Sequence, residues 1–124
     1  MRAAYDLLRP NGLLVVAVPN INSIGFQWFQ KGCCALELSR HLTFFSPTTL
    51  SKLVRKEGFE VLTLKTLGHS SWIRRSVALA KKRAHSLGLL AALRNKLLAS
   101  FAAGYMELRG AGEDLYLVAQ KPAR

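Results

Sequence analysis

Acidic residues are scarce in this sequence of 124 residues. Seven Asp and Glu stand against 18 Lys and Arg, which gives a formal net charge of +11. The segment from Val61 to Met106 contains no acidic residue. Such a balance suits an anionic partner such as phosphate, nucleic acid or an anionic membrane surface. One basic segment on an ordinary enzyme would give the same balance, so the charge alone selects no function.

Cysteine is also scarce, and Cys33 and Cys34 are adjacent. A disulfide between sequence neighbours is strained, and two cysteines make no disulfide framework. We therefore expect a reducing, cytoplasmic compartment. Both cysteines and His41 could be imagined as metal ligands, but no paired CxxC or HxxxH spacing accompanies them, and no metal site is expected.

Long apolar runs are missing as well. The start, "MRAAYDLLRP", lacks the apolar segment of a signal peptide. The longest apolar region, residues 87–106, is interrupted by Arg94, Asn95 and Lys96, which argues against a membrane-spanning helix. Half of all residues are nonetheless hydrophobic, so one small domain with a packed core is expected.

The first part of the chain predicts a helix, a turn and a strand. Residues 3–8 indicate the last turns of a helix, and "RPNG" turns the chain. Leu13 to Val18, "LLVVAV", is apolar on both faces, which is typical of a strand covered on both sides in a parallel sheet. Ligands of open α/β sheets bind beyond the carboxyl ends of the strands, so Pro19 and Asn20 are expected at a crevice.

The following segment, residues 19–38, resembles a loop and carries three large aromatics, Phe26, Trp28 and Phe29. Two interpretations of this segment remain: a lid over a site, or a short helix packed on the domain. The stretch "SPTTLSKLVRKEGFEV" then predicts a helix with Ser46 as its N-cap and Gly58 at its end. A strand over residues 59–67 is expected after it.

The acid-free segment is mostly helical by its pattern, from Trp72 to about Leu108, with a basic arc on one side. Residues 114–121 then alternate as a strand does. Gly110 and Gly112 form a GxG, but a dinucleotide fingerprint needs a helix after it. A turn before the last strand is the better interpretation.

The order of these elements resembles the C-terminal half of a class I S-adenosylmethionine-dependent methyltransferase. "LRPNGLLVVAVPN" is similar to that family's "LKPGG" and fifth strand, with Asn11 in place of the first Gly. A bacterial subgroup with "PN…S", an aromatic loop and "PRHL…FS…TL…GF" is nearer. Here the chain has Pro19-Asn20, Ser23, Trp28 and "SRHLTFFSPTTLSKLVRKEGFEV", with Ser39 replacing Pro, and then "GEDLYLVAQKP".

The resemblance implies an α/β fold with a partial Rossmann-like sheet. The family's strand order is 3-2-1-4-5-7-6, with strand seven antiparallel. Residues 13–18 would be strand five, residues 59–67 strand six and residues 114–121 strand seven. Residues 70–108 would be a basic helical insertion between the last two strands.

Strands one to four of that fold have no counterpart here, nor do the glycine-rich loop and the acidic residue that hold S-adenosylmethionine. The resemblance therefore implies that residues 1–124 are the C-terminal part of a methyltransferase domain without cofactor-binding residues. The intact enzyme would transfer a methyl group to a small-molecule acceptor. A truncated gene, a mis-assigned start at Met1 and a half that docks with another chain are the origins considered. We expect the chain to be inactive without the cofactor-binding half, and its status as an enzyme stays open.

Methyl transfer is an in-line displacement that depends mostly on positioning, so no fixed catalytic constellation is required. His41 is the one candidate general base, because its ordinary pKa lies near neutrality. Asn20, Trp28 and Arg40 are the candidate substrate-binding residues: an amide at the crevice, an aromatic cover, and a cation for carboxylate or phosphate. For each, a structural role in turn, loop or core is the alternative.

The basic helices also allow a non-enzymatic function. A basic amphipathic segment over residues 72–108 suits an anionic membrane surface, with a peripheral location at the membrane. Nucleic acid is not expected as a partner, because neither a nucleic-acid module nor interleaved aromatics are present. Without a neighbouring strand, residues 13–18 would offer an apolar edge, and we expect self-association through it.

Overall fold

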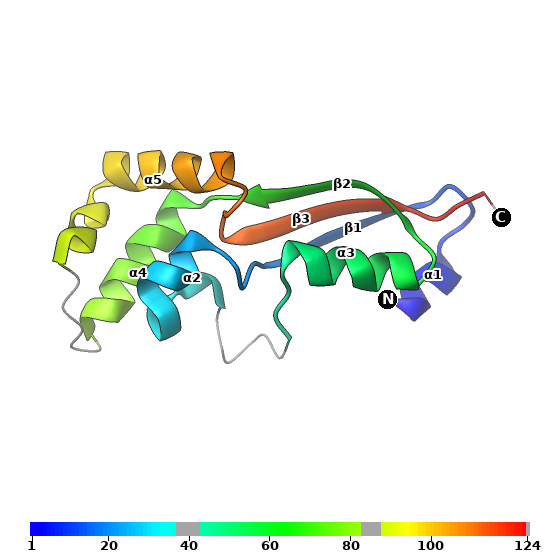
Figure 1. The fold of residues 1–124 in the computed structure, drawn as a ribbon, viewed down its shortest axis with the longest axis horizontal. Coiled ribbons are helices and arrows are strands. Elements are labelled where there is room, and N and C mark those ends of the chain that lie inside the picture. Colours follow the sequence, from blue (N-terminus) through cyan, green and yellow to red (C-terminus); the bar gives the residue numbers. More distant parts are fainter. Residues whose placement is uncertain (37–42, 83–87, 124) are drawn as a thin grey trace.

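A three-stranded sheet forms one end of the molecule. The computed structural model describes residues 1–36, 43–82 and 88–123. The strands are β1 (Leu13–Pro19), β2 (Glu60–Leu67) and β3 (Asp114–Gln120), in the order β1-β3-β2 (Figure 1). β3 is antiparallel to both neighbours. The three expected strands are confirmed, and so are the order five-seven-six and the reversed direction of the last strand.

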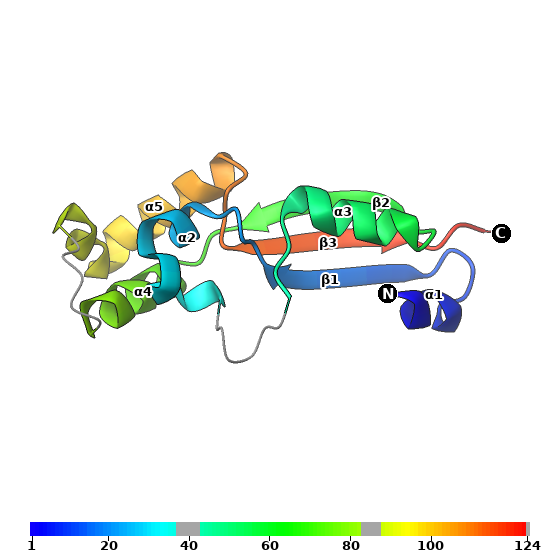
Figure 2. The same cartoon turned by 60° about the horizontal axis from the view of Figure 1, so that its bottom comes forward.

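Helices gather mainly at the opposite end of an elongated molecule. The α-helices are α1 (Arg2–Leu7), α2 (Ile24–Phe29), α3 (Pro47–Lys56), α4 (Ser70–Lys82) and α5 (Lys96–Leu108), and the 3-10 helices are η1 (Gln30–Gly32), η2 (Cys34–Leu36) and η3 (Gly88–Arg94). Figures 1 and 2 show α3 lying along the sheet, α1 beyond one end of the strands, and α2, α4 and α5 beyond the other. Between β2 and β3, the described residues 70–82 and 88–108 are mainly helical, as their pattern predicts.

One face of the sheet carries the first hydrophobic core. Leu50 and Val54 of α3 are fully buried there against Leu115 and Leu117 of β3. The side chains that line this face are Tyr5, Leu8, Leu14, Val16, Val18, Phe45, Phe59, Val61, Leu64 and Ala119. Because α3 and Tyr5 of α1 pack on this side, the alternate residues Leu14, Val16 and Val18 of β1 are partly buried.

The opposite face of β1 is the exception to the prediction. Leu13 is 55% exposed and Val15 is 54% exposed, although the run "LLVVAV" predicts a strand covered on both sides. Among the described residues, the helices that pack on β1 lie on its other face. Both faces of the strand carry apolar side chains, but only one face is covered in this structure.

A second core joins α2, α4 and α5. Ile73 and Val77 of α4 are buried against Ala99 and Met106 of α5, and Phe29 of α2 closes the cluster. The segment after β1 therefore contains a short packed helix, begun by Ser23, whose Oγ accepts a hydrogen bond from Phe26 N. Of the two alternatives for this segment, the packed helix is the one observed over residues 24–29.

Local capping explains where elements begin and turn. Ser46 Oγ accepts from Thr49 N at 3.1 Å, and Thr49 Oγ1 accepts from Ser46 N at 2.8 Å, so α3 starts with a reciprocal cap. Gly58 has a φ of 94° just after the helix. Asn11 has a φ of 63° in the turn before β1, where the family motif has Gly. Asn is one of the few other residues that adopt this left-handed conformation readily.

Candidate functional site

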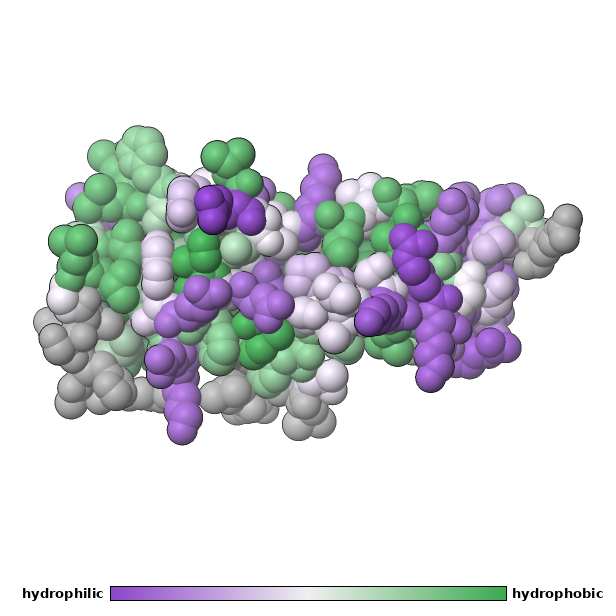
Figure 3. All heavy atoms as spheres, viewed as in Figure 1, coloured by the Kyte–Doolittle hydropathy of each residue, from purple (hydrophilic) through white to green (hydrophobic). Residues whose placement is uncertain are grey.

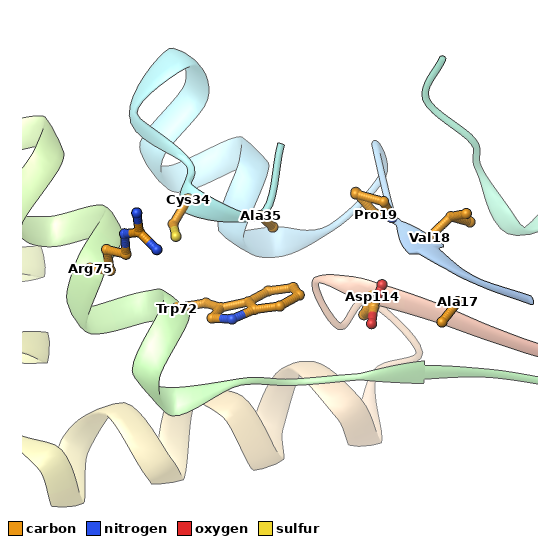
Figure 4. A pocket seen from close by; sticks show the side chains of 8 residues that line it. All are labelled: Ala17, Val18, Pro19, Cys34, Ala35, Trp72, Arg75 and Asp114. Carbon is orange, nitrogen blue, oxygen red and sulfur yellow. The ribbon is translucent and has the colours of Figure 1, made fainter. Parts of the chain in front are cut away.

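A cavity of about 210 Å³ opens at the carboxyl end of β1 (Figure 4). Strand, loop and helix all contribute to its wall. The lining residues are Ala17, Val18, Pro19, Cys34, Ala35, Trp72, Arg75 and Asp114. Pro19, one of the two residues expected at a crevice, forms part of the wall, whereas Asn20 does not.

The strand pairing and one helix turn position the polar wall. Asp114 is the first residue of β3 and pairs with Pro19 of β1 on one side and with Leu67 of β2 on the other. Trp72 and Arg75 are three residues apart on α4, so both reach the same side of that helix. In Figure 4 the indole of Trp72 lies between the guanidinium of Arg75 and the carboxylate of Asp114.

An imidazole lies next to this wall. His69 Nε2 is 3.8 Å from Asp114 Oδ2, which is beyond hydrogen-bond distance. The His69 and Trp72 rings are 4.2 Å apart with an angle of 41° between their planes. Asp114 keeps 17% of its side chain exposed, so its carboxylate lies at the edge of the cavity. The polar wall therefore combines an acid, an indole and a guanidinium, and an imidazole lies beside it.

Glu113, the neighbour of Asp114, is fully buried. Neither of its carboxylate oxygens has a hydrogen-bond partner among the described residues. The packing is tight, because a Cβ at Gly25 would lie 2.6 Å from Glu113 Oε1. Burial is the largest reason that the pKa of Glu113 rises to about 7; the backbone N–H of His69 acts to lower this pKa, and the negative charge of Asp114 acts to raise it.

Asn20 lies beneath the cavity rather than in its wall. Its side chain is 1% exposed, and its Nδ2 donates to Gly112 O at 2.9 Å while its Oδ1 accepts from Asn22 N at 3.0 Å. Its backbone N also donates to Glu113 O at 2.9 Å. These bonds tie the end of β1 to the start of β3. A substrate contact by Asn20 stays a prediction.

The other predicted site residues are not brought together. Trp28 is 36% exposed, packs edge-on against Phe29 at 6.4 Å between ring centroids, and is not among the cavity-lining residues. Arg40 and His41 lie outside the described residues. The substrate role of Trp28 and Arg40 and the base role of His41 stay predictions.

Sequence reasoning gave no site role to Trp72, Arg75 and Asp114, which form the polar wall. Of their neighbours, His69 was treated as structural and Glu113 was given no role. The consecutive acids Glu113 and Asp114, which follow a long acid-free segment after the single Glu107, were the available signal. Among the described residues, no group of His, Cys, Asp or Glu has an arrangement that could hold a metal ion.

Two solved structures are similar to this chain. The [4+2]-cyclase SpnF matches 99% of this chain with 43% of its own, at a TM-score of 0.52 and 17% identity. A putative sarcosine dimethylglycine methyltransferase from Galdieria sulphuraria matches 98% of this chain with 46% of its own, at a TM-score of 0.51 and 15% identity. The chain thus spans less than half the length of these structures, and the likeness shows the fold.

At the level of sequence, no curated protein matches the chain. The sequence model of a methyltransferase domain matches residues 1–64, which is more than half of the 124 residues. The matched segment contains β1, its carboxyl end at the cavity, α3 and most of β2. With strand order, cavity position and this match in agreement, the chain belongs to the methyltransferase domain family.

Proposed function

We propose that this chain forms the acceptor-binding side of an S-adenosylmethionine-dependent methyltransferase that acts on a small molecule. The observation that carries the proposal is the cavity at the carboxyl end of β1, which is where ligands bind in open α/β sheets. Its walls hold charged and aromatic side chains that can orient a small molecule, and orientation is what a reaction such as methyl transfer mainly requires.

The cavity does not fit the whole methyl donor. Its volume of about 210 Å³ is below the roughly 300–1,000 Å³ of pockets that hold drug-sized ligands. The sequence also lacks a glycine-rich loop between a strand and a helix, the feature that receives nucleotides in such folds. We therefore assign this cavity to the acceptor and derive no step through the donor.

The chemistry of the wall indicates the kind of acceptor. Trp72 offers a flat apolar surface, while Arg75 and Asp114 present opposite charges on either side of it (Figure 4). A small molecule with an apolar part and polar groups suits this arrangement. One similar structure is described as a putative sarcosine dimethylglycine methyltransferase and another as a [4+2]-cyclase. Since one fold hosts several chemistries, the wall and not the fold must identify the acceptor.

Tryptophan fluorescence tests this assignment directly, because the chain has only two tryptophans. Trp28→Phe leaves Trp72 as the single reporter at the cavity. A panel of small amines, amino acids, phenols and hydroxy acids is titrated into this variant. We expect at least one class to change its emission saturably, and Arg75→Ala to weaken that change.

Arg74→Ala is the matched control, because Arg74 Nε donates to Arg94 O at 3.1 Å and does not line the cavity. The assignment fails if every compound leaves Trp72 emission unchanged, or if Arg74→Ala weakens binding as much as Arg75→Ala. Calorimetric titration with S-adenosylmethionine gives the complementary result. Tight binding of the donor by this chain would overturn the assignment of the cavity to the acceptor.

A further inference from the structure

Helix α5 is apolar around most of its circumference. Ala99, Ala103 and Met106 face the second core and are buried. A separate arc of the same helix faces solvent, and we define this outer arc by its residues, Leu97, Leu98, Phe101, Gly104, Tyr105 and Leu108. Only Lys96, Ser100 and Glu107 form a polar strip between the two arcs. A helix with so little polar surface is normally buried on all sides.

The outer arc is nevertheless strongly exposed. Phe101 is 76% exposed and Leu108 is 86% exposed. Leu89 of η3, just before α5, is 92% exposed and extends the apolar surface. Figure 3 shows these apolar side chains gathered over η3 and α5 along the upper left of the molecule. A continuous apolar surface of this kind marks a site of contact with a membrane or another protein.

The charge around the arc favours a membrane over a second copy of the chain. The segment from Val61 to Met106 has no acidic residue, and Arg74, Arg94 and Lys96 adjoin the start of α5. Two arcs brought together would also bring together two segments in which cations outnumber the one acidic residue of α5, Glu107, and such segments repel. An anionic lipid surface attracts the same cations while it takes up the apolar side chains.

The arc also lies away from the open edge of the sheet. α5 packs on the β2 side, where a Cβ at Gly68 would overlap the carbonyl oxygen of Ala103. Among the described strands, β1 pairs only with β3 and forms the opposite edge. A strand added beside β1 would therefore extend the sheet away from α5, and it would not cover the arc.

We propose that the outer arc of α5, together with η3, inserts into the surface of an anionic membrane. The apolar side chains enter the boundary between headgroups and acyl chains, and Arg94 and Lys96 contact the lipid phosphates. This inference goes beyond the proposed methyl transfer and stands independently of it. None of the described helices has the length and apolarity needed to cross a bilayer, so the contact is with the surface.

Vesicle co-sedimentation tests the inference with the full chain. Phosphatidylcholine vesicles are compared with vesicles that also contain phosphatidylglycerol. We expect binding to the anionic vesicles and little to the neutral ones. Phe101→Ser should lower the partition coefficient about tenfold, because most of the buried ring contact is lost. The double variant R94Q/K96Q should lower the partition coefficient about fivefold for each charge removed. Added salt should weaken the binding of the wild type.

Leu7→Ser is the matched control, because Leu7 is also an exposed apolar residue, at 88%, but lies on α1. It should bind vesicles as the wild type does. Circular dichroism checks that both serine variants are folded. The inference is overturned if Phe101→Ser binds like Leu7→Ser, or if neutral and anionic vesicles bind the chain equally. It is also overturned if sedimentation velocity shows a wild-type dimer that Phe101→Ser dissociates, while vesicles capture neither protein.

Discussion

Replacing Glu113 with Gln should change how the stability of this protein depends on pH. Glu113 is fully buried beside the cavity, and neither oxygen of its carboxylate has a hydrogen-bond partner among the described residues. Burial is the main reason that its pKa rises from the ordinary 4.5 to about 7. The folded state therefore holds the proton more tightly than the unfolded chain does.

The sign follows from this difference. Below about pH 4.5 the carboxyl is protonated in both states, so its burial does not lower the free energy of unfolding. Between about pH 4.5 and about pH 7 the unfolded chain releases the proton and the folded state keeps it, so the free energy of unfolding falls as pH rises. A pKa of about 7 against 4.5 corresponds to a total loss of about 3 kcal/mol above pH 7. Between about pH 5 and about pH 8 the loss should be roughly 2–3 kcal/mol.

Urea unfolding at several pH values measures this effect. Glu113→Gln removes the titration while keeping the shape of the side chain, so its free energy of unfolding should fall less than that of the wild type over this range. The difference between the two curves, roughly 2–3 kcal/mol, is the quantity to compare. The buried amide has unsatisfied groups of its own, but their cost does not change with pH.

Glu107→Gln makes the same change in net charge at an exposed position and serves as the control. Parallel pH curves for the wild type and Glu113→Gln would refute the reasoning. That outcome would mean that the folded state supplies Glu113 with a hydrogen bond or a water that holds it charged.

Three further predictions concern the fold. Gly68→Ala should destabilise the chain by at least about 1 kcal/mol, because the new Cβ overlaps the backbone of Ala103. Gly104→Ala should instead stabilise α5 by about 0.5–1 kcal/mol, because no atom lies within 4 Å of its new Cβ. Thermal unfolding of both variants checks the pair. Asn11→Val should cost about 1–2 kcal/mol, since β-branched residues tolerate the φ of 63° poorly, whereas Asn11→Gly should cost little in the same assay. The wild type should self-associate through the edge of β1, and Val15→Lys should reduce this self-association in sedimentation velocity. A wild type that stays monomeric at every concentration would contradict the prediction.

The elements that were predictable from the sequence are those with local signals. The alternation in residues 114–121 and the apolar run 13–18 predicted strands that the structure places at Asp114–Gln120 and Leu13–Pro19. Ser46 and Gly58 correctly predicted the start and the end of α3, because an N-cap and a left-handed glycine act on their immediate neighbours. Strand order came from the resemblance to a family and not from any local pattern.

The cavity residues could not be predicted in the same way. Trp72 and Asp114 are distant in sequence and meet only because β2 pairs with β3 and α4 follows directly from β2. No motif records that pairing. Asn20 was selected for its place at the end of a strand, yet both its Nδ2 and its Oδ1 form hydrogen bonds with the backbone. Position along the chain identified the crevice, and the three-dimensional pairing decided which side chains line it.

Helix α4 links the two surfaces to which we assign function. One of its faces carries Trp72 and Arg75 to the cavity, and another packs Ile73 and Val77 against α5. Surface variants such as Arg75→Ala and Phe101→Ser leave this packing intact, so each reports on one surface. A variant of the core between α4 and α5 would disturb both at once. The two proposals can therefore be tested separately only with exposed residues, and each surface provides one.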